Sequence, residues 1–239
     1  MRALLGLVLV VSSLAFAPGP SAAAPAGATA RGSGEVVLDG VTVHLRKGTR
    51  QVLTVNHTRG YHARVTLWAL RDGGWVRRMR AADGRTGYGG LVAARRRHQG
   101  TGSTPLGTFR LPWAFGTRAG AAGWSLGYRR IHRGDFWVED NASRYYNRYR
   151  NQRRGGFRWR LPASDENSSE RLSDHPVQYE LSIVTSFNHR QVRHRGAGIF
   201  VHVNGDGATA GCVSAPRWFL RGLMARLEPR QVPVVAIGR

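Results

Sequence analysis

Short segments in which apolar residues occupy every second position follow one another along most of this chain, and they limit it to a fold built mainly of β-strands. The pattern is clearest at 177–187, where it predicts a half-buried strand. Segments 64–70 and 75–79 flank Arg71-Asp72-Gly73-Gly74, and an Asp-Gly step between two strands predicts a hairpin. The remaining predicted strands are 36–45 with a turn at Asp39-Gly40, 51–57, 108–111, 129–138, 197–203 and 231–237.

One amphipathic helix is predicted at 216–228, close to the C-terminus. Its apolar residues fall on one helical face, and they are Phe219, Leu220, Leu223, Met224 and Leu227. Pro216 suits the first turn of a helix and Pro229 follows its end, as is typical of proline at helix boundaries. Segment 145–170 has little periodicity and many polar residues, which predicts a long surface loop. The expected fold is therefore mainly β, with one helix before the last strand.

The first residues of the chain predict export. Arg2 precedes a short apolar run, and a helix-breaking Pro-Gly-Pro then leads to a series of small residues. The apolar run is shorter than the roughly 20 residues that span a bilayer, so we expect 1–24 to be a signal peptide that is removed. Residues 25–35 are predicted to be a disordered lead-in, and 36–239 to be one domain. No cysteine follows the signal, so we expect no lipid anchor and a secreted or wall-associated protein.

The chain is strongly basic, with 36 Lys and Arg against 14 Asp and Glu and a formal net charge of +22. A protein of this charge attracts polyanions, and outside a cell these include the anionic polymers of the wall. The arginines are scattered in short groups, and neither a zinc-finger spacing nor an RNA-recognition motif accompanies them. We therefore expect a solvated basic surface, with anionic wall polymers as a further partner and no specific nucleic-acid partner.

Cys212 is the only cysteine of the chain. Exported proteins normally pair their cysteines, so a single thiol outside the cell indicates a chemical role. A thiol attacks as its thiolate and needs a base. His202, which ends an apolar strand ten residues earlier, is the candidate. Gly211 lets the backbone approach a substrate closely, so the N–H groups of Gly211 and Cys212 are candidate donors to an oxyanion.

Two other interpretations of these residues stay open at this point. The first is an inert thiol packed beside a core histidine. The second is half of a zinc site, but no second pair of ligands is evident near Cys212 and His202. We therefore expect no metal and no cofactor.

Several segments resemble the L,D-transpeptidases of the YkuD type. The histidine of 199–202 and the Thr-Ala-Gly-Cys-Val-Ser-Ala-Pro of 209–216 are similar to that family's active-site signature, a histidine followed by Ser/Thr-x-Gly-Cys. The sequence Gly-Ser-Thr-Pro-Leu-Gly-Thr-Phe at 102–109 resembles a second family segment, G-x-x-x-T-P-x-G-x-[FY]. Segments around 136–140, 145–147 and 169–172 are similar to a branch common in secreted actinobacterial proteins.

The resemblance covers most of the chain after about residue 50, and it implies a β-sandwich and a catalytic domain at 36–239. It implies that Cys212 forms a thioester with a peptidoglycan stem tetrapeptide, releases D-alanine, and passes the acyl group to an amine of a second stem. His202 is then the general base, and the N–H groups of Gly211 and Cys212 stabilise the oxyanion. Peptidoglycan stem peptides are the expected partners, and a monomer is expected.

The cysteine turn departs from the commonest family pattern at two positions. Ala210 stands where Ser-His-Gly-Cys has its second histidine, and Ser214 stands where an Arg or Asn follows the cysteine. His202 is therefore the only nearby base, and Thr209 and Ser214 are expected to support the turn. Two other functions stay open: a cysteine L,D-carboxypeptidase, in which water resolves the thioester, and a non-catalytic basic module that binds the cell wall.

Overall fold

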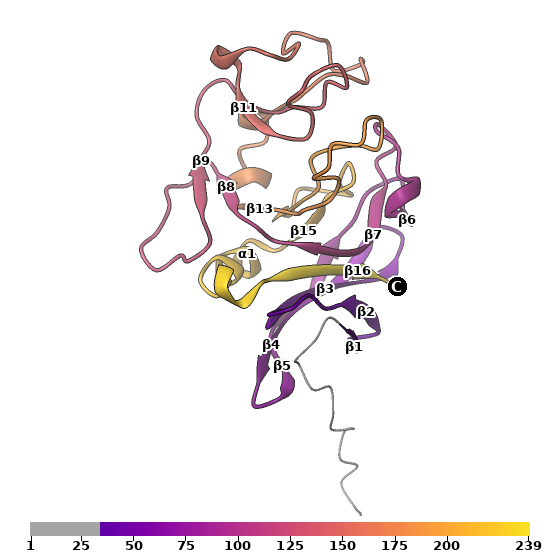
Figure 1. The fold of residues 1–239 in the computed structure, drawn as a ribbon, viewed down its shortest axis with the longest axis vertical. Coiled ribbons are helices and arrows are strands. Elements are labelled where there is room, and N and C mark those ends of the chain that lie inside the picture. The colour runs from indigo at the N-terminus through magenta and orange to yellow at the C-terminus, as the bar shows by residue number, and fades with distance from the viewer. Residues whose placement is uncertain (1–33) are drawn as a thin grey trace, which may run out of the picture.

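A computed structural model describes residues 34–239, so the predicted signal peptide and almost all of the predicted lead-in lie outside the described residues. Eleven strands form one sheet in the order β6-β7-β16-β3-β4-β5-β15-β14-β13-β8-β9 (Figure 1). Their bounds are β3 Gln51–Arg59, β4 His62–Arg71, β5 Gly74–Arg85, β6 Leu91–Ala93, β7 Thr104–Arg110, β8 Ala114–Gly116, β9 Tyr128–Arg130, β13 Ser182–Val184, β14 Phe200–Val203, β15 Val213–Ala215 and β16 Val234–Gly238.

The sheet folds over a large apolar core, which gives the expected mainly β sandwich. Side chains of β3, β4 and β16 meet those of β13, β14 and β15 there, and the one α-helix, α1 (Arg217–Met224), buries its apolar face in the same core. The helix packs against β5 and β14. Its predicted apolar face is confirmed, although the helix ends at Met224 instead of continuing to residue 228. In the part of the chain that the structure describes, no helix is long and apolar enough to cross a membrane.

A hairpin of β1 (Glu35–Leu38) and β2 (Val41–His44) covers the outer face of β3 and β16. This packing follows from the period of a strand, because alternate residues of β3 point to opposite faces. Leu53 and Val55 point into the sandwich, whereas Val52 packs against the hairpin. The predicted β4–β5 hairpin is also present, and its turn residues Asp72 and Gly73 have the positive φ angles of 47° and 79° that a type I′ hairpin turn requires.

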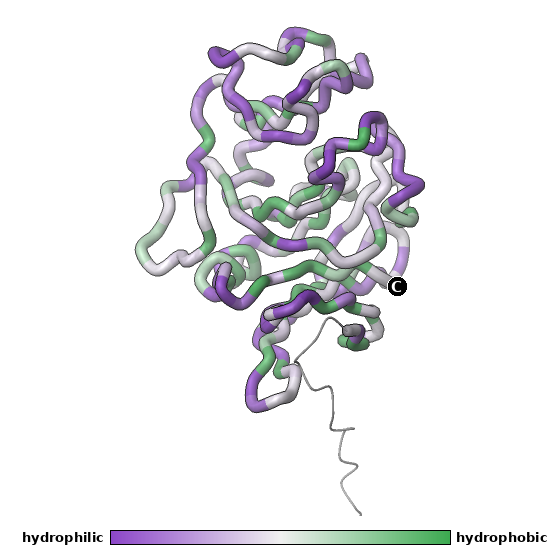
Figure 2. Tube along the Cα trace, in the orientation of Figure 1, coloured by the Kyte–Doolittle hydropathy of each residue, from purple (hydrophilic) through white to green (hydrophobic). Residues whose placement is uncertain are grey.

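A smaller sheet lies above the sandwich in Figure 1, and its strands are β10 (Asp135–Trp137), β11 (Tyr149–Asn151) and β12 (Glu170–Arg171). An aromatic cluster joins the two parts, with Phe115 and Phe200 from the large sheet packed against Trp137 and Tyr146 from the smaller part. Figure 2 shows that the small sheet and its connections are mostly hydrophilic, whereas the strands of the sandwich are rich in hydrophobic residues. The Cys212 side chain belongs to this aromatic cluster.

Three predictions on local structure were wrong. The predicted strand at 177–187 begins only at Ser182, because a 3₁₀ turn at Gln178–Glu180 (η4) precedes it and leaves Val177 51% exposed. The predicted strand at 129–138 is split between two sheets, since a turn through Gly134 separates β9 from β10. The segment 145–170 is more than a surface loop, because the side chain of Tyr146 is fully buried.

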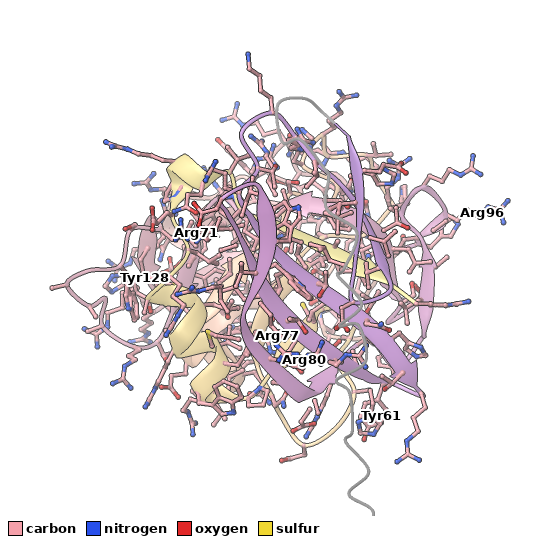
Figure 3. The ribbon with its side chains drawn as sticks, turned by 90° about the horizontal axis from the view of Figure 1, so that it is seen from below. Tyr61, Arg71, Arg77, Arg80, Arg96 and Tyr128 are labelled. Carbon is pink, nitrogen blue, oxygen red and sulfur yellow. The ribbon has the colours of Figure 1, made fainter. Side chains whose placement is uncertain are left out.

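The basic side chains are spread around the molecule. Figure 3 shows Arg71, Arg77 and Arg80 on the side of the β4–β5 hairpin, with Arg96 projecting from another edge. Other short 3₁₀ turns are η1 (Ala94–Arg96), η2 (Gln152–Arg154), η3 (Leu172–Asp174) and η5 (Pro229–Gln231).

Candidate active site

The sheet places the predicted nucleophile and the predicted base on one face. β14 and β15 are neighbouring parallel strands in which Val201 is opposite Val213 and His202 is opposite Ser214. Side chains alternate between the two faces of a sheet. Val201 and Val213 therefore point into the sandwich core, whereas His202 and Cys212 point to the opposite face. Both residues line one cavity of about 680 Å³ between the large sheet and the smaller part of the molecule.

The Cys212 thiol is nearly buried, with 8% of the residue exposed. Its sulfur accepts a hydrogen bond from the Phe200 N–H at 3.3 Å and donates one to the Gly198 carbonyl at 3.0 Å. Burial raises the pKa of the thiol well above its ordinary value, and the Phe200 N–H and the Arg97 charge oppose this only in part. The resting thiol is therefore protonated, and it becomes a nucleophile only when a base removes its proton during attack.

The His202 ring has a defined tautomer. Its Nδ1 lies 2.8 Å from the Val203 carbonyl oxygen, and a carbonyl can only accept a hydrogen bond. Nδ1 therefore carries the proton, and Nε2 has the free lone pair that a base needs. Burial lowers the pKa of His202 to about 4, so the ring is neutral at neutral pH. Tyr179 packs edge-on against it, with ring centroids 5.5 Å apart.

Hydroxyl groups hold the turn that carries the cysteine. Thr209 Oγ1 accepts a hydrogen bond from the Gly211 N–H at 3.1 Å and donates one to the Cys212 carbonyl at 2.7 Å. Thr104 Oγ1 donates to the Gly211 carbonyl at 2.9 Å and accepts from the Gly87 N–H at 2.7 Å. Thr104, at the start of β7, therefore links the cysteine turn to β7 and to the chain segment at Gly87.

The turn needs a glycine before the cysteine. Gly211 has φ of +124°, and a Cβ there would lie 2.8 Å from the Ser103 carbonyl oxygen. Of the two predicted oxyanion donors, Gly211 is the less available one, because its N–H already donates a hydrogen bond to Thr209 Oγ1 in this structure. Ser214, the other supporting residue predicted, is fully buried and its Oγ has no hydrogen-bond partner in the described residues. It does not line the cavity, so it is not positioned to contact a substrate.

The cavity contains ionisable residues that the sequence analysis did not select. Glu139 and Glu170 line it together with Arg97. Burial and the nearby charge of Glu170 raise the pKa of Glu139 to about 8. Burial is also the largest cause that raises the pKa of Glu170, whose carboxylate accepts a hydrogen bond from the Tyr179 hydroxyl. Glu139 and Glu170 fall within segments used for the family resemblance, but nothing in their spacing indicates that they meet at the cysteine.

A mainly β domain that holds a thiol and a neutral imidazole in one cavity has the arrangement expected of a cysteine-dependent acyl-transfer enzyme. The model of the YkuD family, the L,D-transpeptidase catalytic domain, matches residues 50–235, and the chain belongs to this family. It thus contains an L,D-transpeptidase-type catalytic domain, and the family acts on peptidoglycan stem peptides. Comparison with curated proteins and with solved structures gave no match. Within residues 34–239, no group of three or more His, Cys, Asp or Glu side chains is arranged to hold a metal ion.

Proposed function

We propose that this protein is an exported peptidoglycan L,D-transpeptidase that uses Cys212 as its nucleophile and His202 as its general base. The observation that carries the proposal is the pairing of β14 with β15, which brings both side chains to one face and one cavity. The tautomer of the imidazole supports it as well, because Nδ1 is bonded to a backbone carbonyl and Nε2 is left with the lone pair.

In the first half-reaction, the Cys212 sulfur attacks the carbonyl carbon that joins the third residue of a tetrapeptide stem to its terminal D-alanine. His202 Nε2 takes the thiol proton during this attack, since neither group is charged beforehand. The tetrahedral intermediate then loses the C–N bond, and the imidazolium gives its proton to the leaving amine of D-alanine. A thioester between Cys212 and the third residue remains.

In the second half-reaction, an amine of another stem attacks the thioester carbonyl and gives a proton to His202. The C–S bond breaks, the thiolate regains a proton from the imidazolium, and an amide crosslink is formed. Water in place of the amine gives a carboxypeptidase reaction through the same intermediate. The Cys212 N–H is the proposed oxyanion donor, and a single such donor is worth about 3 kcal/mol in other enzymes.

The cellular setting is part of the proposal. Export through residues 1–24 places the enzyme where its substrate is, and the charge of +22 favours retention by anionic wall polymers. A monomer is sufficient for this chemistry, because both proposed catalytic side chains come from one chain.

The test is a product analysis with purified tetrapeptide stems. The protein should release D-alanine and form stem dimers detectable by mass spectrometry, and Cys212→Ala and His202→Ala should each abolish or strongly reduce both. His194→Ala is the matched control, because His194 is an exposed histidine outside the cavity. Release of D-alanine without dimers would identify a carboxypeptidase. No release by the folded protein would favour a non-catalytic wall-binding module.

A further inference from the structure

Arg97 is a buried guanidinium beside the cysteine turn. It follows η1, it is 5% exposed, and its side chain lines the same cavity as Cys212. Among the described residues it is the only buried arginine, whereas its neighbour Arg96 projects into solvent (Figure 3). A buried charge is costly unless a partner compensates it, so the position of this side chain requires an explanation.

The backbone makes room for this guanidinium at two glycines. A Cβ on Gly196 would lie 1.5 Å from Arg97 Nη1, and a Cβ on Gly211 would lie 2.8 Å from Nη2. The guanidinium is thus held directly against the residue that precedes the nucleophile. Its orientation is fixed by backbone oxygens, because Nε donates to the Ser103 carbonyl at 2.7 Å and Nη1 donates to the Arg195 carbonyl at 3.2 Å.

No carboxylate of the described residues forms a salt bridge with Arg97, and its Nη2 has no hydrogen-bond partner among them. Other acids of this chain are paired with arginine, as Asp140 is with Arg158 at 2.6 Å. Glu139 is the carboxyl group whose charge acts on Arg97, and its pKa of about 8 leaves it mostly protonated at neutral pH. The face of the Phe187 ring lies against the guanidinium, with 5.5 Å between the ring centroid and the guanidinium carbon, but no ionised carboxylate neutralises the charge. Arg97 therefore presents a positive charge to the cavity, with one nitrogen free to donate.

We propose that Arg97 binds the C-terminal carboxylate of the donor stem peptide, an inference that rests on the proposed function. In a tetrapeptide donor this carboxylate belongs to the leaving D-alanine, so only the amide nitrogen and one carbon separate it from the carbonyl carbon under attack. A cation that binds it must lie next to the nucleophile, and Arg97 lies next to Gly211. Guanidinium binds carboxylate through directed, charge-assisted hydrogen bonds, so Arg97 selects stems that end in a free D-amino acid.

A purely structural role is the competing explanation, since Arg97 also pins the backbone at Ser103 and Arg195. The two roles predict different effects on two substrates, the tetrapeptide and the same tetrapeptide with a C-terminal amide. Carboxylate binding predicts that the wild-type protein has a kcat/KM for D-alanine or D-alaninamide release at least about tenfold higher on the acid than on the amide. A structural role predicts no link between residue 97 and the identity of that terminal group.

The experiment measures both substrates with wild type, Arg97→Gln, Arg97→Lys and Arg96→Gln. We expect Arg97→Gln to lose most of its activity on the acid and far less on the amide, so that the preference disappears. Arg97→Lys keeps a positive charge and should retain part of the preference for the acid, whereas Arg96→Gln should retain the full preference. If Arg97→Gln loses kcat/KM by the same factor on both substrates, so that its preference for the acid is undiminished, the proposal is overturned.

The wild-type protein alone provides a test that does not depend on the folding of any variant. Release from the acid and the amide at equal rates contradicts the role of Arg97 and leaves the proposed function intact. Release from neither contradicts the proposed function itself, and the role of Arg97 falls with it.

Discussion

Lowering the pH from 7 to 5 should leave the acylation of Cys212 almost unchanged. The base must be neutral to take a proton, and burial lowers the pKa of His202 to about 4. At pH 5 a group with that pKa is about 90% neutral, whereas a histidine with the ordinary pKa of about 6.5 would be only about 3% neutral. The two cases differ about thirtyfold in rate at pH 5, which is far outside the error of a kinetic measurement.

The assay is the rate of covalent labelling by a carbapenem, followed by intact-protein mass spectrometry between pH 4 and 9. The expected profile is flat from about pH 5 to 8, with its acid limb near pH 4. Cys212→Ala reports any labelling elsewhere. An acid limb near pH 6.5 would refute the buried, neutral imidazole, and a rate that rises tenfold per pH unit up to pH 9 would show attack by a free thiolate instead of a thiol–imidazole pair.

Protein stability must be followed in the same buffers, because the same shift acts on folding. The pKa of His202 is lower in the folded state, so the unfolded chain binds the extra proton between about pH 6.5 and 4, and stability falls as the pH falls through this window. The loss is on the order of 3 kcal/mol for this one group. Circular dichroism at each pH separates unfolding from protonation of the base.

Three further predictions concern the scaffold. Thr104→Val removes the hydroxyl that bonds the Gly87 N–H and the Gly211 carbonyl, so the free energy of unfolding in urea should fall by about 1–3 kcal/mol per unpaired group. Thr104→Ser should recover most of this stability, and equal stability of all three proteins would contradict the role of the hydroxyl. Gly211→Ala forces a Cβ to 2.8 Å from the Ser103 carbonyl oxygen at a φ of +124°, which should destabilise the turn by about 1–3 kcal/mol and slow the acylation of Cys212 strongly. Acylation at the wild-type rate would mean that the turn adjusts freely to the added methyl group. Phe219→Ala should destabilise the protein by about 3–5 kcal/mol, whereas Trp218→Ala on the same helix should cost less than about 1 kcal/mol, because Trp218 is 54% exposed. Similar losses of stability for the two variants would show that the packing of α1 against the sheet is described wrongly.

Much of the scaffold could be predicted because it depends on local patterns. Asp72-Gly73 makes a tight hairpin turn wherever it joins two strands, and the apolar face of α1 is visible at helical spacing. The pattern failed at 177–181, where Tyr179 is buried in the aromatic cluster from a 3₁₀ turn and not from a strand. Period-two spacing indicates which residues are buried, but here it does not identify the backbone conformation, which is a 3₁₀ turn and not a strand.

The site could be predicted only in part, for a similar reason. His202 lies on β14, and Cys212 follows ten residues later, immediately before the neighbouring strand β15. Their order along the chain therefore carried the information. Arg97 and Glu139 come from distant segments that meet only when the smaller sheet packs over the larger one. Arg97 in particular belongs to a run of three arginines, which is typical of exposed charge, and only its burial distinguishes it from its neighbours.

The role of Cys212 as the nucleophile is tested most directly by the intact mass of the protein after incubation with a carbapenem at neutral pH. If His202 activates Cys212, the wild-type protein forms one adduct, Cys212→Ala forms none, and His202→Ala reacts much more slowly. An unmodified wild-type protein that is demonstrably folded, or an equal adduct on Cys212→Ala, would contradict the claim that this buried thiol is activated by the imidazole on the neighbouring strand.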